Sequence, residues 1–499
     1  MPEETLPAKE RSLAALITAF LLAAVHQYLF FDKIPGVSYP IFVCLFYGYA
    51  LYFAKARLRP FNWFSYTWLG AIALLSLTYA LFFNKFFFGL NFILIPGLVL
   101  LHMTYMLSVK RPSWSSFGLI GNALEHFFPQ NLRHWVTALR IVKKSGGGSI
   151  KDERKQVLVK VLIGLAISFP LLLIVISLLS SADGVFQNML SELPKLLDKI
   201  SFGEGVARFL WIFLLGLGCF GFIWGFLDTK IYQHKVEIKD ELLSPQPVSL
   251  KIDPVILTTI LVAINLVYVL FVVVQFSYLF GAWEGALPEG TSYAEYARSG
   301  FFELILVTSI NFVILLLSLL GAEKGKAALQ KIINILLYVL VGCSTVMLYS
   351  AYTRLALYEE VYGYTYIRFL VHAFMIFLGL LLIIAALRIA IERVPLAKCY
   401  IVLGLVSYVL MNYIGMDRII VNQNLDRYAD SGKLDTAYIV SLAPEIIPTL
   451  IDFSRDEKGM LDEELRNQWW DNAQETWKWQ SFNVSRHRAQ KALEDYFTH

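Results

Sequence analysis

Acidic and basic side chains gather at the ends of several long apolar segments in the second half of the chain. Glu303 and Arg368 each lie a few residues inside such a segment, on the same predicted side of a membrane. An Arg guanidinium binds a phosphate or a carboxylate through two parallel hydrogen bonds, so converging segment ends could form one polar site. The predicted outer-surface polar site consists of Glu295, Arg298, Glu303, Arg354, Tyr362, Thr365 and Arg368.

A second interpretation is that these residues are interfacial anchors and salt bridges between loops, which any helical bundle needs. Glu303 bears on the choice because it lies about one turn inside its segment, where an unpaired carboxylate is costly and is often functional. We predict that Glu303 reaches Arg368 or Arg298 directly or through one water, since pairing offsets the desolvation of both charges.

The usual signatures of soluble enzymes are missing from the sequence. It contains no GxxxxGK[ST] phosphate loop, no HExxH zinc motif and no GxSxG nucleophile motif. The cysteines sit singly in or beside apolar runs, which is typical of small buried hydrophobes rather than of metal or redox sites. We therefore predict no catalytic residue, no metal site and no cofactor. The four cysteines are Cys44, Cys219, Cys343 and Cys399.

The elements that carry these residues are predicted to be membrane-spanning helices. The chain is 57% hydrophobic and only 16% charged, whereas a soluble domain has about a quarter of its residues charged. A spanning helix needs about 20 mostly apolar residues. Eleven segments qualify, although the second and the last are short and the count is open between ten and twelve. They are 12–31, 40–55, 63–83, 86–108, 157–180, 207–227, 254–280, 300–320, 332–352, 366–389 and 398–415.

The distribution of basic residues predicts the orientation. With the N-terminus inside, the inner segments carry 24 Lys and Arg residues and the outer loops carry 8. Basic residues are retained on the cytoplasmic side of a membrane, so this bias places the N-terminus inside and the segment after the eleventh span outside. The predicted fold class is therefore all-α: a polytopic transmembrane helical bundle with a small extracytoplasmic helical C-terminal tail.

Four regions follow from these assignments. Residues 1–108 form a four-span membrane region, and 109–156 form a basic cytoplasmic loop with an aromatic, amphipathic stretch from Phe117 to Trp135. Residues 157–415 form a seven-span core, with a short surface helix expected over 185–200. Residues 416–499 form the acidic tail, which carries 10 basic and 15 acidic residues and apolar side chains at helical spacing.

The run from Tyr293 to Glu303, YAEYARSGFFE, resembles a signature of a bacterial membrane protein family catalogued as domain of unknown function 4173, which has domain of unknown function 4153 as a close relative. A Tyr-Gly-x-Thr pattern from Tyr362 to Thr365, followed by Arg368, also resembles it. The resemblance covers about 160–499 and implies no settled biochemical function. Its tail motif includes Asn424, Asp426, Arg427, Tyr428, Asp435, Trp479, Asn483 and Arg486.

Three classes of function are compatible with these observations. The first is a non-enzymatic envelope protein that senses, scaffolds or assembles through its tail, with the lipid bilayer and an envelope protein as partners. The second is a transporter or flippase for an anionic or lipid-linked substrate, and the third is an intramembrane enzyme acting on a lipid-linked substrate. The first ranks highest because charge stays at the ends of the spans. The net charge of +4 is spread over many loops and predicts no nucleic-acid partner.

Overall fold

The computed structural model describes residues 8–109, 113–145, 203–228, 252–283, 301–321, 326–473 and 478–498. Within these ranges the chain is all-helical and contains no β-strand. Nine of the described helices are long and apolar enough to cross a membrane, which identifies a multi-pass membrane protein. They are α1 (Ala8–Phe30), α3 (Trp63–Leu81), α4 (Lys85–Leu107), α9 (Gly203–Leu227), α11 (Pro254–Trp283), α13 (Phe301–Gly321), α14 (Ala327–Tyr362), α15 (Tyr366–Ala390) and α16 (Leu396–Tyr413).

These nine helices match nine of the eleven predicted segments. The second segment forms α2 (Ser38–Ala54), which at 17 residues is shorter than any of the nine. The fifth segment, 157–180, and the surface helix expected over 185–200 lie outside the described residues. The exact span count and the orientation therefore stay predictions.

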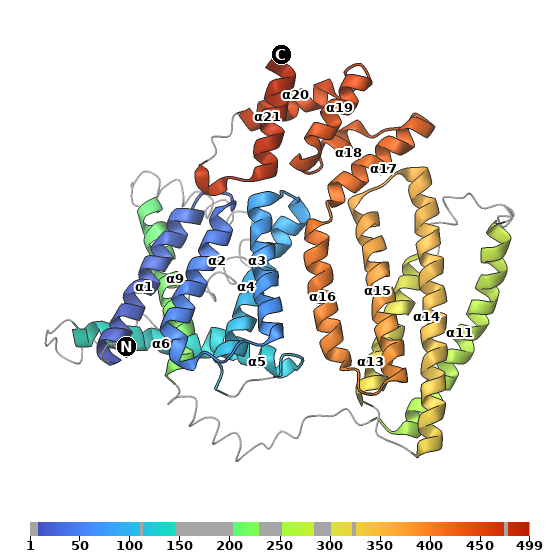
Figure 1. Cartoon of the computed structure of the whole chain (residues 1–499), viewed down its shortest axis with the longest axis horizontal. Helices are drawn as coiled ribbons and strands as arrows, with labels where there is room; N and C mark the ends of the chain where they lie inside the picture. Colours follow the sequence, from blue (N-terminus) through green and yellow to red (C-terminus); the bar gives the residue numbers. More distant parts are fainter. Residues whose placement is uncertain are drawn as a thin grey trace, which may run out of the picture. The chain divides into compact units, whose positions relative to one another are not determined.

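The chain divides into two compact units, of which the first comprises Met1–Leu81, Gly89–Glu237 and Thr476–Val484. Its helices α1 to α4 and α9 are shown in blue and green in Figure 1. The end of α1 meets the start of α9, because Trp211 Nε1 donates to His26 Nδ1 at 3.0 Å and the Arg208 guanidinium lies 4.7 Å above the Phe31 ring. The two helices therefore run antiparallel.

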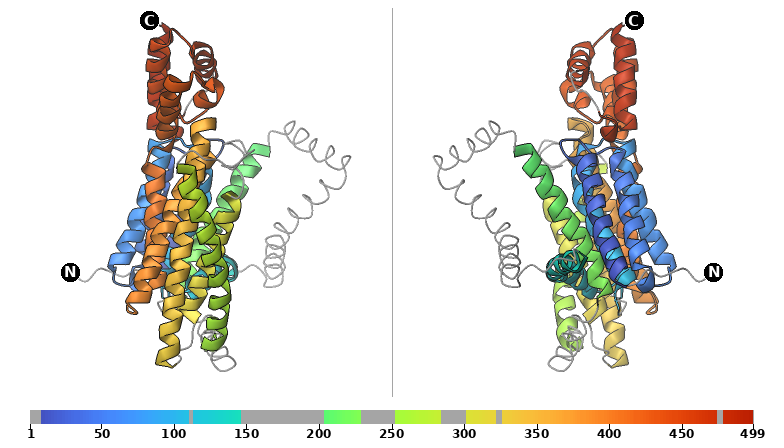
Figure 2. Two further views of the ribbon diagram at one scale, coloured as in Figure 1. Left: turned by 90° about the vertical axis from the view of Figure 1, so that its right-hand side faces the viewer. Right: turned by 90° about the vertical axis from the view of Figure 1, so that its left-hand side faces the viewer.

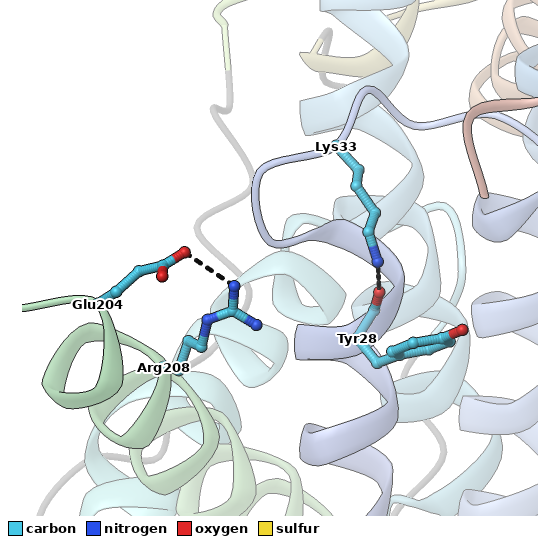
Figure 3. Close-up of polar contacts among 4 residues, drawn as sticks. All are labelled: Tyr28, Lys33, Glu204 and Arg208. Atoms are coloured by element: carbon cyan, nitrogen blue, oxygen red, sulfur yellow. Dashed lines mark hydrogen bonds and ion pairs between the residues drawn. The ribbon is translucent and has the colours of Figure 1, made fainter. Parts of the chain in front are cut away.

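Two further polar contacts mark this end of unit 1 (Figure 3). Arg208 pairs with Glu204 one turn earlier in α9, at 2.8 Å, and Lys33 donates to the backbone carbonyl of Tyr28 at the end of α1. The late segment 478–484 also lies here. Val37 N donates to the carbonyl of Phe482 at 2.9 Å.

The opposite end of unit 1 carries basic side chains. Arg11 at the start of α1 donates through Nη2 to the Phe53 carbonyl at the end of α2, at 2.9 Å. A 3₁₀ turn over Lys55–Arg57 follows α2. At the same end, three helical pieces follow α4 without spanning: α5 (Phe117–Glu125), a π-helical turn η2 (His126–Gln130) and α6 (Asn131–Ser145).

The second unit comprises Phe82–Phe88, Ile238–Glu475 and Ser485–His499. Its centre is the 36-residue helix α14, on which α11, α13 and α15 pack, with α16 beside α15. Leu261, Leu340 and Ala351 in this core are fully buried. Ile252 N donates to the Gly321 carbonyl at 2.9 Å, so α11 begins where α13 ends.

The predicted tail helices are present in unit 2 and share a second apolar core, in which Val421, Ile446, Leu450 and Leu465 are fully buried. Glycines in the left-handed conformation bound the first of these helices at Gly415 and Gly432, a position at which a side chain is disfavoured. The elements are α17 (Met416–Ser431), α18 (Thr436–Val440), η3 (Pro444–Ile446), α19 (Ile447–Asp456), α20 (Asp462–Ala473) and α21 (Val484–Thr498), with the short turn η4 (Trp479–Ser481) in unit 1.

Candidate functional site

The polar contacts of unit 2 concentrate where the tail meets the turn between α14 and α15. We call this region the tail junction: the turn 360–366, helix α17 and the side chains bonded to them. In it, the side-chain amide of Asn424 pairs with one backbone residue. Its Oδ1 accepts from Tyr364 N at 3.0 Å, and its Nδ2 donates to the Tyr364 carbonyl at 2.9 Å and to the Ile420 carbonyl at 2.8 Å. The backbone of Tyr364 and Ile420 thereby satisfies the hydrogen-bonding groups of this buried amide, and the amide in turn holds Tyr364 in place.

Arg427, one turn further along α17, caps the end of α14. Its Nε donates to the Glu360 carbonyl at 3.0 Å and its Nη2 to the Val361 carbonyl at 2.7 Å. The last four carbonyls of a helix lack partners within the helix, and a guanidinium fork can satisfy two of them at once. Arg427 and Asn424 therefore bond to the backbone of the turn 360–366 at both its start and its middle.

Gly363 allows this close approach. It adopts φ +81°, and a Cβ built on it would lie 2.8 Å from Asn424 Oδ1 and 3.2 Å from Arg427 Nη1. A side chain here would meet both a backbone conformation that L-residues rarely adopt and two polar groups that are already engaged. The close approach of Asn424 and Arg427 thus explains why the Tyr-Gly-x-Thr pattern has a glycine at this position.

Asp417 at the start of α17 is a buried carboxylate with neutral partners. Its Oδ2 accepts from Asn84 Nδ2 at 2.6 Å, and its Oδ1 accepts from the Tyr366 hydroxyl and, at 3.2 Å, from Ala443 N. Only 5% of Asp417 is exposed. Burial raises the pKa of Asp417 above its ordinary value, although the hydrogen bonds from Asn84 and Ala443 oppose the rise.

Glu445 is a second largely buried carboxylate of the junction. One oxygen, Oε1, accepts from Phe83 N at 3.0 Å, while Oε2 is buried without a hydrogen-bond partner among the described residues. Burial raises the pKa of Glu445 to about 6, and the charge of Asp417 adds to the rise. A carboxyl group with this pKa changes charge within the range of natural extracellular pH.

A buried acid–base pair lies one turn before the end of α14. Glu359 Oε2 and His372 Nε2 of α15 are 2.8 Å apart, and the edge of the Tyr352 ring packs on the imidazole. Within the part of the chain that the structure describes, the second oxygen of Glu359 and His372 Nδ1 have no hydrogen-bond partner, and only 3% of Glu359 is exposed. Breaking such a pair leaves one buried charge without compensation.

The predicted partners of Glu303 are Arg368 or Arg298, reached directly or through one water. Glu303 lies in the first turn of α13 and is exposed, and within the described part of the chain no hydrogen bond or ion pair joins it to Arg368. Arg368 instead donates to the Gly363 carbonyl and stacks on the Tyr358 ring, 4.5 Å from its centroid. The Gly363 carbonyl and the Tyr358 ring of α14 therefore contact the guanidinium in place of a carboxylate. The other predicted partner, Arg298, lies with Glu295 outside the described residues.

The remaining residues of the predicted outer-surface site have separate positions in unit 2. Thr365 is the residue before α15, and Tyr362 is the last residue of α14, half exposed with its ring on Tyr358. Arg354 lies two turns before the end of α14 and is partly buried. The structure therefore gathers Tyr362, Thr365 and Arg368 at one turn and leaves Glu303 apart from them.

The predicted tail motif serves several local purposes. Asp435 caps α18 by accepting from Tyr438 N at 3.0 Å, and Tyr428 packs edge-on against Phe453. Asp426 is exposed. Arg486 lies 3.6 Å above the Phe83 ring, within unit 2.

Two residues of the motif belong to unit 1. Asn483 Nδ2 donates to the Tyr79 carbonyl at 2.8 Å, and the exposed Trp479 ring lies 6.4 Å from that of Tyr28. The motif is thus divided between the two units.

The site residues predicted from the sequence do not include Asn84, Tyr366, Asp417 or Glu445. These residues are far apart in the chain, and each polar side chain can be explained by its local surroundings alone. One signal was available, because Glu445 stands between two prolines in an otherwise apolar run, LAPEIIPTL. Within the described ranges, no three His, Cys, Asp or Glu side chains come together as metal ligands.

A family model described as "Domain of unknown function (DUF4153)" matches residues 69–453 of the sequence. This chain belongs to the DUF4153 family. The match begins in α3, well before the predicted start near residue 160, and ends in α19. The DUF4153 region therefore contains the whole turn 360–366, Asp417, Asn424, Arg427 and Glu445.

The comparison shows the family that was predicted as the relative, and a match to 4173 is not shown. No curated protein and no solved structure matches the chain.

Proposed function

We propose that this DUF4153 protein is a non-enzymatic sensor of the bacterial cytoplasmic membrane, with its N-terminus inside and its tail outside the cell. In this proposal the tail junction responds to external acidity and transmits the response to α14 and α15. The observation that carries the proposal is the buried Asp417, which bonds at once to the tail through Ala443 and to the first residue of α15, Tyr366.

The second carboxylate supports a response to protons. Glu445 has one satisfied and one unsatisfied oxygen, and its pKa is raised to about 6. Protonation removes a buried charge and supplies an O–H donor for a neighbouring acceptor. Within unit 2, the tail is therefore expected to dock more firmly on the turn 360–366 and the loop Phe82–Phe88 at acidic than at neutral pH.

The arrangement of charge supports the orientation. In unit 1 the basic residues Arg11, Lys55 and Arg57 lie at the end opposite to the one where the tail segment 478–484 bonds to Val37 and Tyr79. Basic residues favour the cytoplasmic side, which supports a position of the tail outside the cell. The exposed surface of the tail, including Trp470, is then available to an envelope protein.

Charge placement also favours a sensor over a transporter. Charged residues of the nine candidate spans lie in their terminal turns, except that Arg354 and Glu359 lie one to two turns inside the long α14. A transporter of an anionic substrate would be expected to hold ionisable groups near the middle of several spans.

Hydrogen–deuterium exchange of the full-length protein in lipid nanodiscs tests the proposal. Acidification from about pH 7.5 to about pH 5, with intrinsic exchange rates corrected, should increase protection of both α17 and the turn 360–366. Glu445→Gln should show the protected state at both pH values, whereas Asp426→Asn, which changes an exposed carboxylate of α17, should respond like the wild type. Equal protection of the wild type at both pH values would refute proton sensing at this junction.

A further inference from the structure

The helical pieces α5, η2 and α6 lie at the basic end of unit 1, where η2 and α6 contact α9 and α6 runs across it. Figures 1 and 2 show α6, in teal, running crosswise to α1 and α9. The crossing occurs one to two turns before the end of α9. There a Cβ on Gly221 would lie 2.1 Å from Asn131 Oδ1 and 2.6 Å from the Asn131 carbonyl oxygen. Only a glycine allows α6 to approach α9 this closely.

The face of these helices that meets α9 is buried and uncharged. The His126 ring stacks on Phe226 at 4.0 Å between centroids, and His134 and Ala138 are fully buried. Burial lowers the pKa of His126 to about 4 and also lowers the pKa of His134. Both imidazoles are therefore neutral at physiological pH, and the contact with α9 carries no charge on these residues.

A row of large apolar side chains on α5 and η2 is exposed. Phe117 is 89% exposed, and Ile120, Leu124 and Phe128 follow on the same side at helical spacing, each about half exposed. On this length of backbone, side chains three to four residues apart share one face. A soluble surface seldom carries such a continuous row, which marks an interaction face.

Basic residues follow directly on this row. Arg133 and Arg140 are exposed on α6. In residues 117–145 the charged residues are Arg133, Arg140, Lys143 and Lys144 against the single acidic residue Glu125. An amphipathic helix with an apolar row and excess positive charge fits the headgroup level of a bilayer that contains anionic lipid.

We propose that the segment α5–η2–α6 binds anionic phospholipid of the leaflet at the basic end of unit 1. The row Phe117, Ile120, Leu124 and Phe128 enters the boundary between headgroups and acyl chains, while Arg133 and Arg140 contact phosphate groups. Two observations select lipid as the partner: the charge is complementary to anionic headgroups, and the crossing with α9 places the segment at the end of a membrane-spanning helix.

Site-directed quenching with the full-length protein tests this assignment. A bimane label at Ile120→Cys, in a protein with Cys44→Ala and Cys399→Ala, is reconstituted with brominated phosphatidylglycerol or with brominated phosphatidylcholine. We expect strong quenching by both lipids, with a several-fold preference for phosphatidylglycerol. A label at Ile17→Cys in the middle of α1, which is also exposed, should be quenched by both lipids without preference.

Charge removal separates lipid specificity from simple contact with the membrane. Each basic residue near an anionic surface is worth about a three- to fivefold change in binding. The double variant Arg133→Gln, Arg140→Gln should therefore lose most of the preference while quenching at Ile120 persists. Gel filtration and thermal unfolding of each variant confirm that it is folded.

Three results would overturn the proposal. Absence of quenching at Ile120 by either lipid would mean that another molecule, such as a protein, covers this face. Equal quenching by the two lipids would show contact without headgroup recognition. A preference that survives the double variant would assign recognition to other residues.

Discussion

Asn424 and Tyr364 form a two-way pair in which a side-chain amide takes the place of a neighbouring backbone strand: the amide oxygen accepts from Tyr364 N at 3.0 Å and the amide nitrogen donates to Tyr364 O at 2.9 Å. The pair joins a tail helix to the turn that connects two spans. Because the turn has no repeating hydrogen-bond pattern of its own, its conformation depends on the tail residues bonded to it.

The Asn424 pair can be tested by truncation. Asn424→Ala removes three hydrogen bonds and leaves Tyr364 N without its acceptor, so we expect a loss of about 2–4 kcal/mol in the stability of the docked tail. Limited proteolysis of the protein in nanodiscs measures this stability, as the rate at which the chain is cleaved between α16 and α21. The matched control is Asn422→Ala, an exposed asparagine two residues earlier in the same helix. Similar protease resistance of both variants would show that the pair does not hold the tail.

Gly363 should tolerate no side chain. Gly363→Ala places a Cβ at φ +81° and 2.8 Å from Asn424 Oδ1, with an expected cost of about 1–3 kcal/mol. The readout is the midpoint of thermal unfolding of the purified protein. Gly404→Ala serves as control, because it lies within α16 with open space around its Cβ and is expected to be neutral or slightly stabilising. A neutral Gly363→Ala would contradict the close approach of Asn424 and Arg427.

The raised pKa of Glu445 predicts the direction of a pH effect. Its ordinary value is 4.5 and its value in the folded protein is about 6, so the folded state binds the proton more tightly. The stabilisation is fully present below about pH 4.5 and is lost as pH rises through about 6. The loss amounts to about 2 kcal/mol. Glu445→Gln should flatten stability between about pH 5 and pH 7.5, which chemical denaturation at several pH values would measure. An unchanged slope in this variant would assign the titration to another group.

The buried pair of Glu359 and His372 predicts strong coupling between α14 and α15. His372→Leu leaves the buried Glu359 without its partner and should destabilise the protein by about 3–5 kcal/mol. The double variant Glu359→Leu, His372→Leu should recover much of this loss, because an apolar pair of similar volume carries no desolvation cost. Thermal unfolding of the two single variants and the double variant gives the coupling energy. Additive losses would show that the two residues act independently.

The orientation has a direct topological test. A reporter that is active only in the cytoplasm should work when fused within 109–155 and fail when fused after residue 416, since the basic residues favour the inner side. A periplasmic reporter at the same positions should give the complementary result. The reverse pattern would place the tail inside and remove the external sensing proposal.

The membrane-spanning helices were predictable from the sequence because each is long, apolar and bounded by polar residues. The start of α13 at Phe301 and the start of α15 at Tyr366 fall within two residues of the predicted bounds. The long α14 is the exception, since it runs to Tyr362 rather than 352. Its last turns are polar, and their helical state depends on capping by Arg427, which lies 65 residues beyond the end of the helix.

The cluster around the buried carboxylates could not be predicted from local sequence patterns. Asn84, Asp417 and Glu445 become neighbours only when the loop Phe82–Phe88 joins the tail within unit 2. Among the described residues no direct hydrogen bond or ion pair joins Glu303 to Arg368, and position along a helix does not determine which face of the helix a side chain occupies. The tail motif was more informative, because Asn424 and Arg427 do contact the predicted Tyr-Gly-x-Thr turn.

The bonds between the segment 478–484 and unit 1 have a consequence for biosynthesis. Val37 N and the Tyr79 carbonyl receive their partners from Phe482 and Asn483, which leave the ribosome some 400 residues later. The first helices therefore enter the membrane with these two backbone groups exposed at their ends. These two groups are bonded only after Phe482 and Asn483 have been translated, so a chaperone or the insertion machinery has a long interval in which to bind that end of the helices.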